Sequence, residues 1–198
     1  YPVSYALEWC GWKVEPVNIA LDKAMDINMP EVRQELEETD GEFDAAFIAT
    51  CCKSLSRARE IPRHKGAPRP VRDKEHIKGL LRLQGNEAKL AKRGNTLAEF
   101  SWKIANNRVQ KSAAGDCKAV VLESPKNAWL WEFPEAEEPR ADESWKRNEY
   151  DACAWTAARC KRQALEGNVD QMENVRAKCQ HNHDEDEWKP QWDAAKNK

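Results

Sequence analysis

The chain has 198 residues, of which 40% are hydrophobic and 33% are charged, and its formal net charge is −2. This length suits one domain, and the nine tryptophans compensate for a thin aliphatic content because each aromatic side chain buries a large area. No apolar run approaches the ~20 residues that a membrane-spanning helix needs, which excludes a membrane span. Seven cysteines without framework spacing favour a reducing compartment, so we expect an intracellular protein, nuclear or cytoplasmic.

The first part of the chain carries two helix patterns and one strand pattern. Residues 4–12 are predicted to form a helix that stops at Gly11, and residues 30–39 form a second helix with proline in its first turn. Between them, residues 13–19 alternate like a strand, which Pro16 would confine to a sheet edge. Because the sequence opens without an initiator Met or a secretory signal, we expect a fragment or a processed form.

A cysteine pair in a basic run follows the next predicted strand. Residues 43–49 form an apolar run typical of a buried strand, and Cys51-Cys52 then leads into Ser-Arg-Ala-Arg after three further residues. Residues 61–71 carry three prolines and a glycine and are predicted to form a long loop, a kind of segment that often binds ligands. A strand that delivers a thiol into a basic loop suits an anionic substrate.

The strongest helix pattern covers residues 86–108, and Gly94 is its weak point. The next predicted strand, 116–123, ends at Glu123, so a nucleophile and a carboxylate each stand at the carboxyl end of a strand. The alternation of strands and helices predicts an α/β fold with a parallel sheet. Three shorter elements complete the pattern: a short helix at 129–131, an acidic loop at 134–142 and a strand at 150–155.

Positive charge is concentrated between residues 53 and 93, where thirteen Lys or Arg stand against four acids. Such a stretch is an electrostatic footprint for the phosphate backbone of nucleic acids. The alternative is a solvated basic loop that pairs with the acidic faces of the same protein. The residues predicted to contact nucleic acid are Lys53, Arg57, Arg59, Arg63 and Lys65.

Several motifs, in their order and spacing, resemble those of the DNA (cytosine-5) methyltransferases. Cys51-Cys52 resembles the Pro-Cys motif of that family, with Cys52 at the position of the nucleophile. Glu123-Ser124-Pro125 resembles the Glu-Asn-Val or Glu-Asn-Pro motif that grips the cytosine edge. Residues 155–163 resemble the later Gly-x-Pro-Gln-x-Arg-x-Arg element. Residues 2–12 resemble the helix after the Phe-x-Gly-x-Gly cofactor loop, which this chain does not contain.

The resemblance runs from about residue 4 to residue 168 and carries an expectation for the fold. It implies a Rossmann-like, S-adenosylmethionine-dependent methyltransferase fold, with a mostly parallel sheet flanked by helices and truncated at the N-terminus. The expected organisation is a methyltransferase-like domain over residues 1–180 and a charged C-terminal tail over 181–198.

The resemblance also implies roles for individual residues. Cys52 would add to C6 of a cytosine, and Glu123 would act as the acid near N3. Only a base flipped out of its helix would reach both groups. Arg159 and Lys161 would hold the target base or its phosphates. The residues implied for binding S-adenosylmethionine are Asn18, Asp26 and Ile27.

Plainer interpretations of the same residues stay open. Cys52 could be a small buried hydrophobe, and Glu123 could cap the following helix or pair with a local arginine. The departures from the family motifs also fit a catalytically inactive, methyltransferase-like scaffold or interaction subunit that binds a protein partner. The Cys-x-His-x-His sequence at 179–183 has one-residue gaps that are poor for tetrahedral zinc, so no metal site is predicted.

Overall fold

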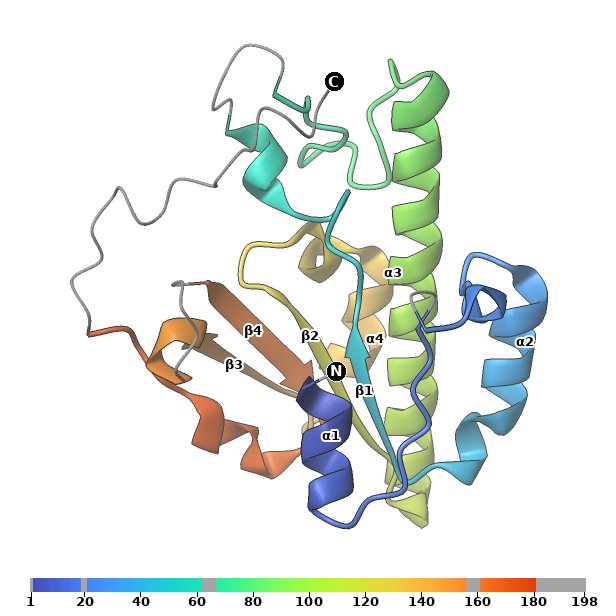
Figure 1. Ribbon diagram of the computed structural model, residues 1–198, viewed down its shortest axis with the longest axis vertical. Coiled ribbons are helices and arrows are strands. Elements are labelled where there is room, and N and C mark those ends of the chain that lie inside the picture. The colour runs from blue at the N-terminus through green and yellow to red at the C-terminus, as the bar shows by residue number, and fades with distance from the viewer. Residues whose placement is uncertain (1, 19–20, 62–66, 156–160, 181–198) are drawn as a thin grey trace. The chain divides into compact units, whose positions relative to one another are not determined.

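The computed structural model describes residues 2–18, 21–61, 67–155 and 161–180 (Figure 1). The chain divides into two compact units, Tyr1–Phe43 and Asp44–Lys198. The second unit contains the whole β-sheet and nearly all of the buried apolar side chains among the described residues.

The N-terminal unit contains two helices joined by irregular chain. Helix α1 spans Pro2–Trp9, and Gly11 follows it with a φ of +86°, which confirms the predicted stop because glycine adopts this conformation without strain. Helix α2 spans Pro30–Thr39, as predicted, with proline in its first turn. The predicted strand at 13–19 is wrong, since residues 12–18 are irregular and Pro16 has no N–H to donate to a ladder. Two 3₁₀ turns cover Lys23–Met25 and Asp40–Glu42.

The second unit is built on a four-stranded mixed sheet. Its strands are β1 (Ala45–Ala49), β2 (Ala119–Pro125), β3 (Lys146–Asp151) and β4 (Arg162–Gly167), in the order β1-β2-β4-β3. Strands β1 and β2 are parallel, whereas the β2/β4 and β4/β3 pairs are antiparallel. The α/β class is confirmed, but the sheet is mixed rather than mostly parallel. The connection between β3 and β4 is too short for the crossover that a parallel pair needs.

Two of these strands follow the sequence pattern and two do not. The strands predicted at 43–49 and 116–123 are confirmed as β1 and β2, but the expectation that the first is buried is wrong, since its residues are exposed or half-buried and Phe47 is 43% exposed. The strand predicted at 150–155 lies earlier, as β3, because Ala152–Trp155 turns into a 3₁₀ helix. Strand β4 was not predicted.

One face of the sheet packs against helix α3, which spans Gly85–Lys111 and is longer than predicted, and against the single turn of α4, Glu137–Arg140 (Figure 1). The indole of Trp102, on α3, is fully buried, and its Nε1 donates to the Leu130 carbonyl at 2.9 Å. This contact joins α3 to the short helix that follows β2, and the tryptophan-rich core forms between them.

The pleat of β2 assigns its side chains to two faces. Leu122 and Ser124 are buried on the face that packs against α3. Since successive side chains alternate across a strand, Glu123 points to the opposite face. The core therefore leaves the carboxylate of Glu123 on the other side of the sheet.

Short helical turns occupy much of the remaining chain. The loop predicted at 134–142 is largely wrong, because a 3₁₀ turn and α4 fill most of it. None of the helices in the described ranges is long and apolar enough to cross a membrane. The 3₁₀ helices of this unit cover Arg57–Glu60, Trp129–Glu132, Pro134–Ala136, Ala152–Trp155 and Asp170–Val175, and a π turn covers Ser112–Asp116.

Candidate functional site

The cysteine pair lies in a loop that is held at both ends. Before the pair, the hydroxyls of Thr50 and Ser101 hydrogen-bond at 2.8 Å. After it, Leu55 is fully buried, and its carbonyl accepts a hydrogen bond of 2.6 Å from the N–H of Trp129. Between these anchors, the Cys51 thiol is exposed and the Cys52 thiol is half-buried.

A buried arginine braces the same loop against α3. Arg72 donates from Nε to the Ser54 carbonyl at 3.0 Å, from Nη2 to the Ala91 carbonyl at 2.9 Å and from Nη1 to Asn95 Oδ1 at 2.6 Å. Burial lowers the pKa of Arg72 to about 10, and the charge of a nearby glutamate opposes this shift. Arg72, although part of the basic segment, is therefore used for structure rather than for contact with a partner.

The packing of α3 explains why glycine stands at position 94, in the middle of the helix. A Cβ atom at this position would lie 1.9 Å from Ser54 Oγ and 2.8 Å from Arg72 Nη2. Glycine thus lets α3 approach the loop that carries Cys52, and the residue predicted as the weak point of the helix is a close-packing position.

Glu123 lies beside the end of β1, because the parallel register pairs it with Ala49. Cys52 follows Ala49 by three residues, so the predicted nucleophile and acid stand at the same end of two adjacent parallel strands. Burial raises the pKa of Glu123, and the charge of Lys161 and the hydrogen bond from the Gln163 side chain oppose this shift. The carboxyl group is thus biased toward its protonated form.

A tyrosine lies near the same carboxylate. The pKa of Tyr150 is raised, first by burial and then by the negative charge of Glu123. Tyr150 pairs with Gln163 across the β3/β4 ladder, and Gln163 donates to Glu123 Oε1. These three side chains form a polar group on the sheet face opposite α3. Of the three, the sequence analysis singled out only Glu123 as a candidate site residue.

The residues predicted to bind nucleic acid have varied surroundings. Lys53 and Lys161 are exposed. Arg57 donates to Glu132 Oε1 at 3.1 Å and lies over the Trp129 ring, with 3.9 Å to the ring centroid. Arg59 donates to a backbone carbonyl at 3.0 Å. Arg63, Lys65 and Arg159 lie outside the described residues.

The residues predicted to bind S-adenosylmethionine belong to the N-terminal unit. Asp26 Oδ1 closes a turn by accepting from the backbone N–H and the side-chain amide of Asn28, at 3.0 and 2.8 Å. The Ile27 carbonyl accepts from Arg33 at 2.8 Å, and the Asn18 carbonyl caps a turn of its own. These contacts are those of a folded turn, in which the Asp26 carboxylate and the Ile27 carbonyl are engaged within the chain. S-adenosylmethionine binding at these residues stays a prediction.

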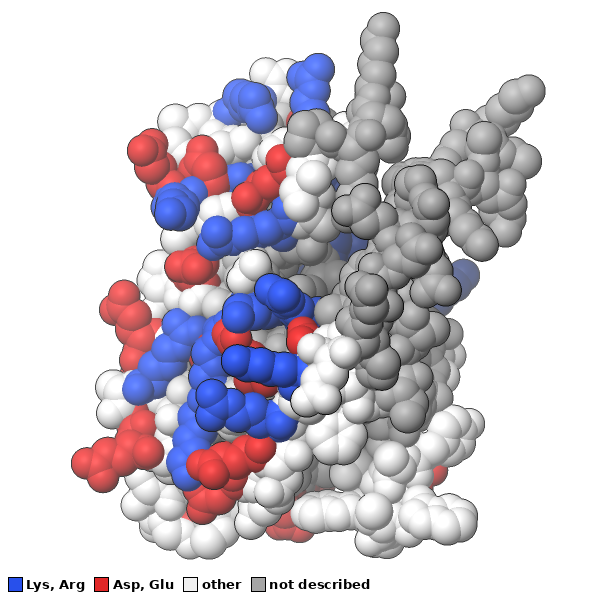
Figure 2. Space-filling view, turned by 90° about the vertical axis from the view of Figure 1, so that its left-hand side faces the viewer, with Lys and Arg blue, Asp and Glu red and all other residues white. Residues whose placement is uncertain are grey.

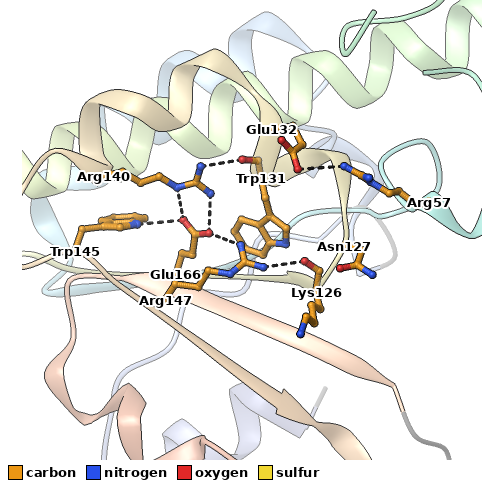
Figure 3. Close-up of a pocket in the computed structure, with 9 residues that line it drawn as sticks. All are labelled: Arg57, Lys126, Asn127, Trp131, Glu132, Arg140, Trp145, Arg147 and Glu166. Atoms are coloured by element: carbon orange, nitrogen blue, oxygen red, sulfur yellow. Dashed lines mark hydrogen bonds and ion pairs between the residues drawn. The ribbon is translucent and has the colours of Figure 1, made fainter. Parts of the chain in front are cut away.

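A cavity of about 570 Å³ lies in the second unit, and sequence reasoning missed it (Figure 3). Two tryptophans and four cationic side chains contribute to its wall. At its base, the carboxylate of Glu166 is fully buried. The lining residues are Arg57, Lys126, Asn127, Trp131, Glu132, Arg140, Trp145, Arg147 and Glu166.

Glu166 fixes two guanidinium groups in this cavity (Figure 3). Arg140 binds it in bidentate fashion, from Nε to Oε2 at 2.8 Å and from Nη2 to Oε1 at 2.7 Å. Arg147 donates from Nη1 to Oε1 at 2.6 Å, and the indole of Trp145 donates to Oε2 at 3.2 Å. The partners lie 19 to 26 residues from Glu166 along the chain, so no short sequence motif contains them together with Glu166.

Charges of both signs share the surface of the molecule. On the side shown in Figure 2, Lys and Arg side chains gather with Asp and Glu beside them. Within the basic segment, Lys78 pairs with Glu99 at 2.8 Å and also contacts Glu135. Part of the positive charge between residues 53 and 93 is thus matched by acids of the same chain.

In the described ranges, no group of three or more His, Cys, Asp or Glu side chains could hold a metal ion. The two histidines of the Cys-x-His-x-His sequence lie outside those ranges. Comparison with protein-family models, with curated proteins and with solved structures finds no match for this chain.

Proposed function

We propose that this chain is a methyltransferase-like protein that activates cytosine in nucleic acid, with Cys52 as nucleophile and Glu123 as acid. The observation that carries the proposal is the β1/β2 register, which pairs Glu123 with Ala49, three residues before Cys52. Ligand sites of open α/β sheets lie outside the carboxyl ends of parallel strands. The motif resemblance to DNA (cytosine-5) methyltransferases supports the same pair of residues.

The loop anchors support the role of Cys52. A nucleophile must reach C6 of a base in one geometry, and positioning of reacting groups contributes several kcal/mol to catalysis (about 7–11 in favourable cases). Thr50 and Leu55 tie the two ends of the cysteine loop to α3 and to the helix after β2. Such anchoring suits a thiol that has to meet a substrate in a defined position.

The burial of Glu123 supports its role as acid. Addition of the Cys52 thiolate to C6 forms a carbon–sulfur bond and drives an electron pair toward N3, which takes the proton of the Glu123 carboxyl. C5 then accepts a proton from solvent. Loss of the original C5 proton, return of the N3 proton to Glu123 and departure of the thiolate regenerate cytosine. The raised pKa of Glu123 keeps the necessary proton available at higher pH.

S-adenosylmethionine, when bound, would supply the methyl group as a sulfonium for the activated C5. Because the Asp26 carboxylate and the Ile27 carbonyl already bind groups of the same chain, we derive no step through the cofactor. Cytosine activation is the part of the reaction that we assign to residues of this chain, and it can be measured without methyl transfer.

The test is exchange of tritium from C5 of cytosine in a single-stranded oligonucleotide into water. We expect the wild-type chain to release tritium, and Cys52→Ser to reduce the rate by at least about a hundredfold because serine is a far weaker nucleophile without an adjacent base. Cys51→Ser is the matched control, the same substitution one residue earlier, and should keep the wild-type rate. Equal rates for the two variants, or no exchange in the wild type, would overturn the proposal.

A further inference from the structure

The cavity around Glu166 has a charge imbalance. Its lining holds four cations against the two acids Glu132 and Glu166. Glu149 binds Lys126 at 2.5 Å, so each of the four cations pairs with an acid, but Arg140 and Arg147 share Glu166 and the four cations exceed the three acids by one charge. A bound anion of single charge would neutralise the cavity.

The guanidinium groups at this cavity are held in fixed orientations. Glu166, fully buried, fixes Arg140 and Arg147 by the hydrogen bonds given above, and Arg140 also donates to the Trp131 carbonyl at 2.9 Å. A guanidinium group carries five N–H donors, and these contacts use three of the five on Arg140. Guanidinium groups held in this way present their remaining donors in a fixed geometry, which suits the oxygens of a phosphate.

Two further side chains with N–H donors, Arg57 and Asn127, line the same cavity. The Nε of Arg57 is buried without a hydrogen-bond partner among the described residues, and the guanidinium of Arg57 is already positioned by Glu132 and Trp129. Asn127 is exposed and lies between Lys126 and Arg57 in Figure 3. The guanidinium of Arg57 and the side-chain amide of Asn127 carry N–H groups, which are the donors that the oxygens of an anion accept from.

The Arg57, Lys126 and Asn127 side of the cavity stands at the same end of the sheet as the candidate cysteine, although Glu166 lies on the face opposite the Glu123 carboxylate. Arg57 follows Cys52 by five residues, and Lys126 and Asn127 follow Glu123 by three and four. The backbone N–H of Lys126 binds the Arg162 carbonyl at 3.0 Å, which ties this wall to β4. One side of the cavity is thus built from the chain that leaves β1 and β2.

We propose that the Arg57, Lys126, Asn127 and Arg147 side of this cavity binds a phosphate group of a nucleic-acid strand. This deepens the proposed function and rests on it for the claim that the bound phosphate belongs to the strand whose base meets Cys52. A phosphodiester carries one negative charge, which matches the excess positive charge of the cavity. A free nucleotide offers the same phosphate chemistry, and the test separates the two sources.

The test measures binding of a fluorescein-labelled single-stranded 12-mer by anisotropy at several salt concentrations. Asn127→Asp places a negative charge in the cavity without a change of side-chain size, so we expect about fivefold or greater weakening at low salt. The slope of log K against log salt should fall in magnitude by about 0.7, the value for one phosphate of a single strand. Asn174→Asp, the same substitution on an exposed residue of Asp170–Val175, should change neither quantity.

Competition with deoxycytidine monophosphate and with inorganic phosphate identifies the source. Displacement of the 12-mer only by other strands supports the nucleic-acid phosphate, whereas displacement by millimolar mononucleotide assigns the cavity to a free phosphate compound and overturns the strand proposal. Equal affinities of Asn127→Asp, Asn174→Asp and wild type for the 12-mer also overturn it. If the wild type binds the 12-mer, Asn127→Asp weakens that binding and no C5 exchange is seen, the proposed reaction is wrong and the phosphate site stays supported.

Discussion

Glu123 has an environment that shifts its pKa away from that of an ordinary surface carboxylate. Its side chain is partly buried beside Tyr150 and Gln163, and burial raises its pKa. A raised pKa means that the folded chain holds a proton on this group at a pH where the unfolded chain has released it. The folded state is therefore favoured at low pH and loses that advantage as the pH rises.

Glu123→Gln tests this environment. The amide keeps an acceptor for the Gln163 side chain but cannot ionise. Below the ordinary pKa of 4.5, we expect the difference in free energy of unfolding between wild type and variant to stay constant. As the pH rises through the raised pKa of Glu123, we expect the wild type to lose stability relative to the variant. Urea denaturation between pH 4 and pH 9 measures this difference. A stability difference that stays constant over this range would contradict the account.

Gly94 has a low helix propensity but is required by the packing of α3 against the cysteine loop. In an exposed helix, glycine to alanine is expected to stabilise by about 1 kcal/mol. Here the new methyl group would lie 1.9 Å from Ser54 Oγ, so we expect Gly94→Ala to destabilise the fold by about 1–3 kcal/mol in urea denaturation.

The double variant Ser54→Ala with Gly94→Ala is the control for this clash. Removing the hydroxyl takes away the nearest obstructing atom, so part of the lost stability should return. A Gly94→Ala variant as stable as the wild type would show that the cysteine loop and α3 are not in close contact.

At the scale of elements, the sequence pattern was reliable where a segment carried its own signal. The proline at the start of α2 and the apolar run of β1 located both elements closely. Strand β4 has no comparable signal: its residues, Arg162–Gly167, read as polar and are buried by pairing with β2 and β3 on both sides. Pairing of this kind depends on distant chain and cannot be seen in the segment itself.

The candidate site divides in the same way. Cys52 and Glu123 were located because each follows a strand pattern, and the direction of two parallel strands then brings their ends together. The cavity around Glu166 depends on Arg140 and Arg147, which reach it from α4 and from β3. Because these side chains come from three different elements, their spacing along the chain has no regular pattern by which a single sequence could predict the site.

Glu166 joins two of these elements to β4, and its removal should be costly. Glu166→Gln leaves two guanidinium groups without their buried counter-charge, and we expect a loss of about 3–5 kcal/mol in the free energy of unfolding. Glu149→Gln is the matched control, because its carboxylate pairs with Lys126 and Arg147 in a more exposed position, and it should cost about 1 kcal/mol or less. Similar losses for the two variants would contradict the anchoring role of Glu166.

At the scale of the whole molecule, the second unit carries both the sheet and the two candidate sites. The face opposite α3 bears Glu123 with its polar neighbours, and the cavity lies around Glu166 on the other side of the β2/β4 pair, since Glu166 pairs with Leu122. We propose that they serve as a base site and a phosphate site for one nucleic-acid strand that passes the end of the sheet.

The most direct test of this account is covalent capture of the nucleophile. A single-stranded oligonucleotide with 2-pyrimidinone in place of one cytosine offers an electrophilic C6, and addition of the Cys52 thiol there, with the proton going to the ring, gives an adduct whose mass is the sum of the two reactants. Peptide mass spectrometry after incubation locates the attachment. We predict modification of Cys52, lost in Cys52→Ser and retained in Cys51→Ser. Attachment at Cys51 instead, or no adduct at any cysteine, would contradict the assignment of Cys52 as the nucleophile.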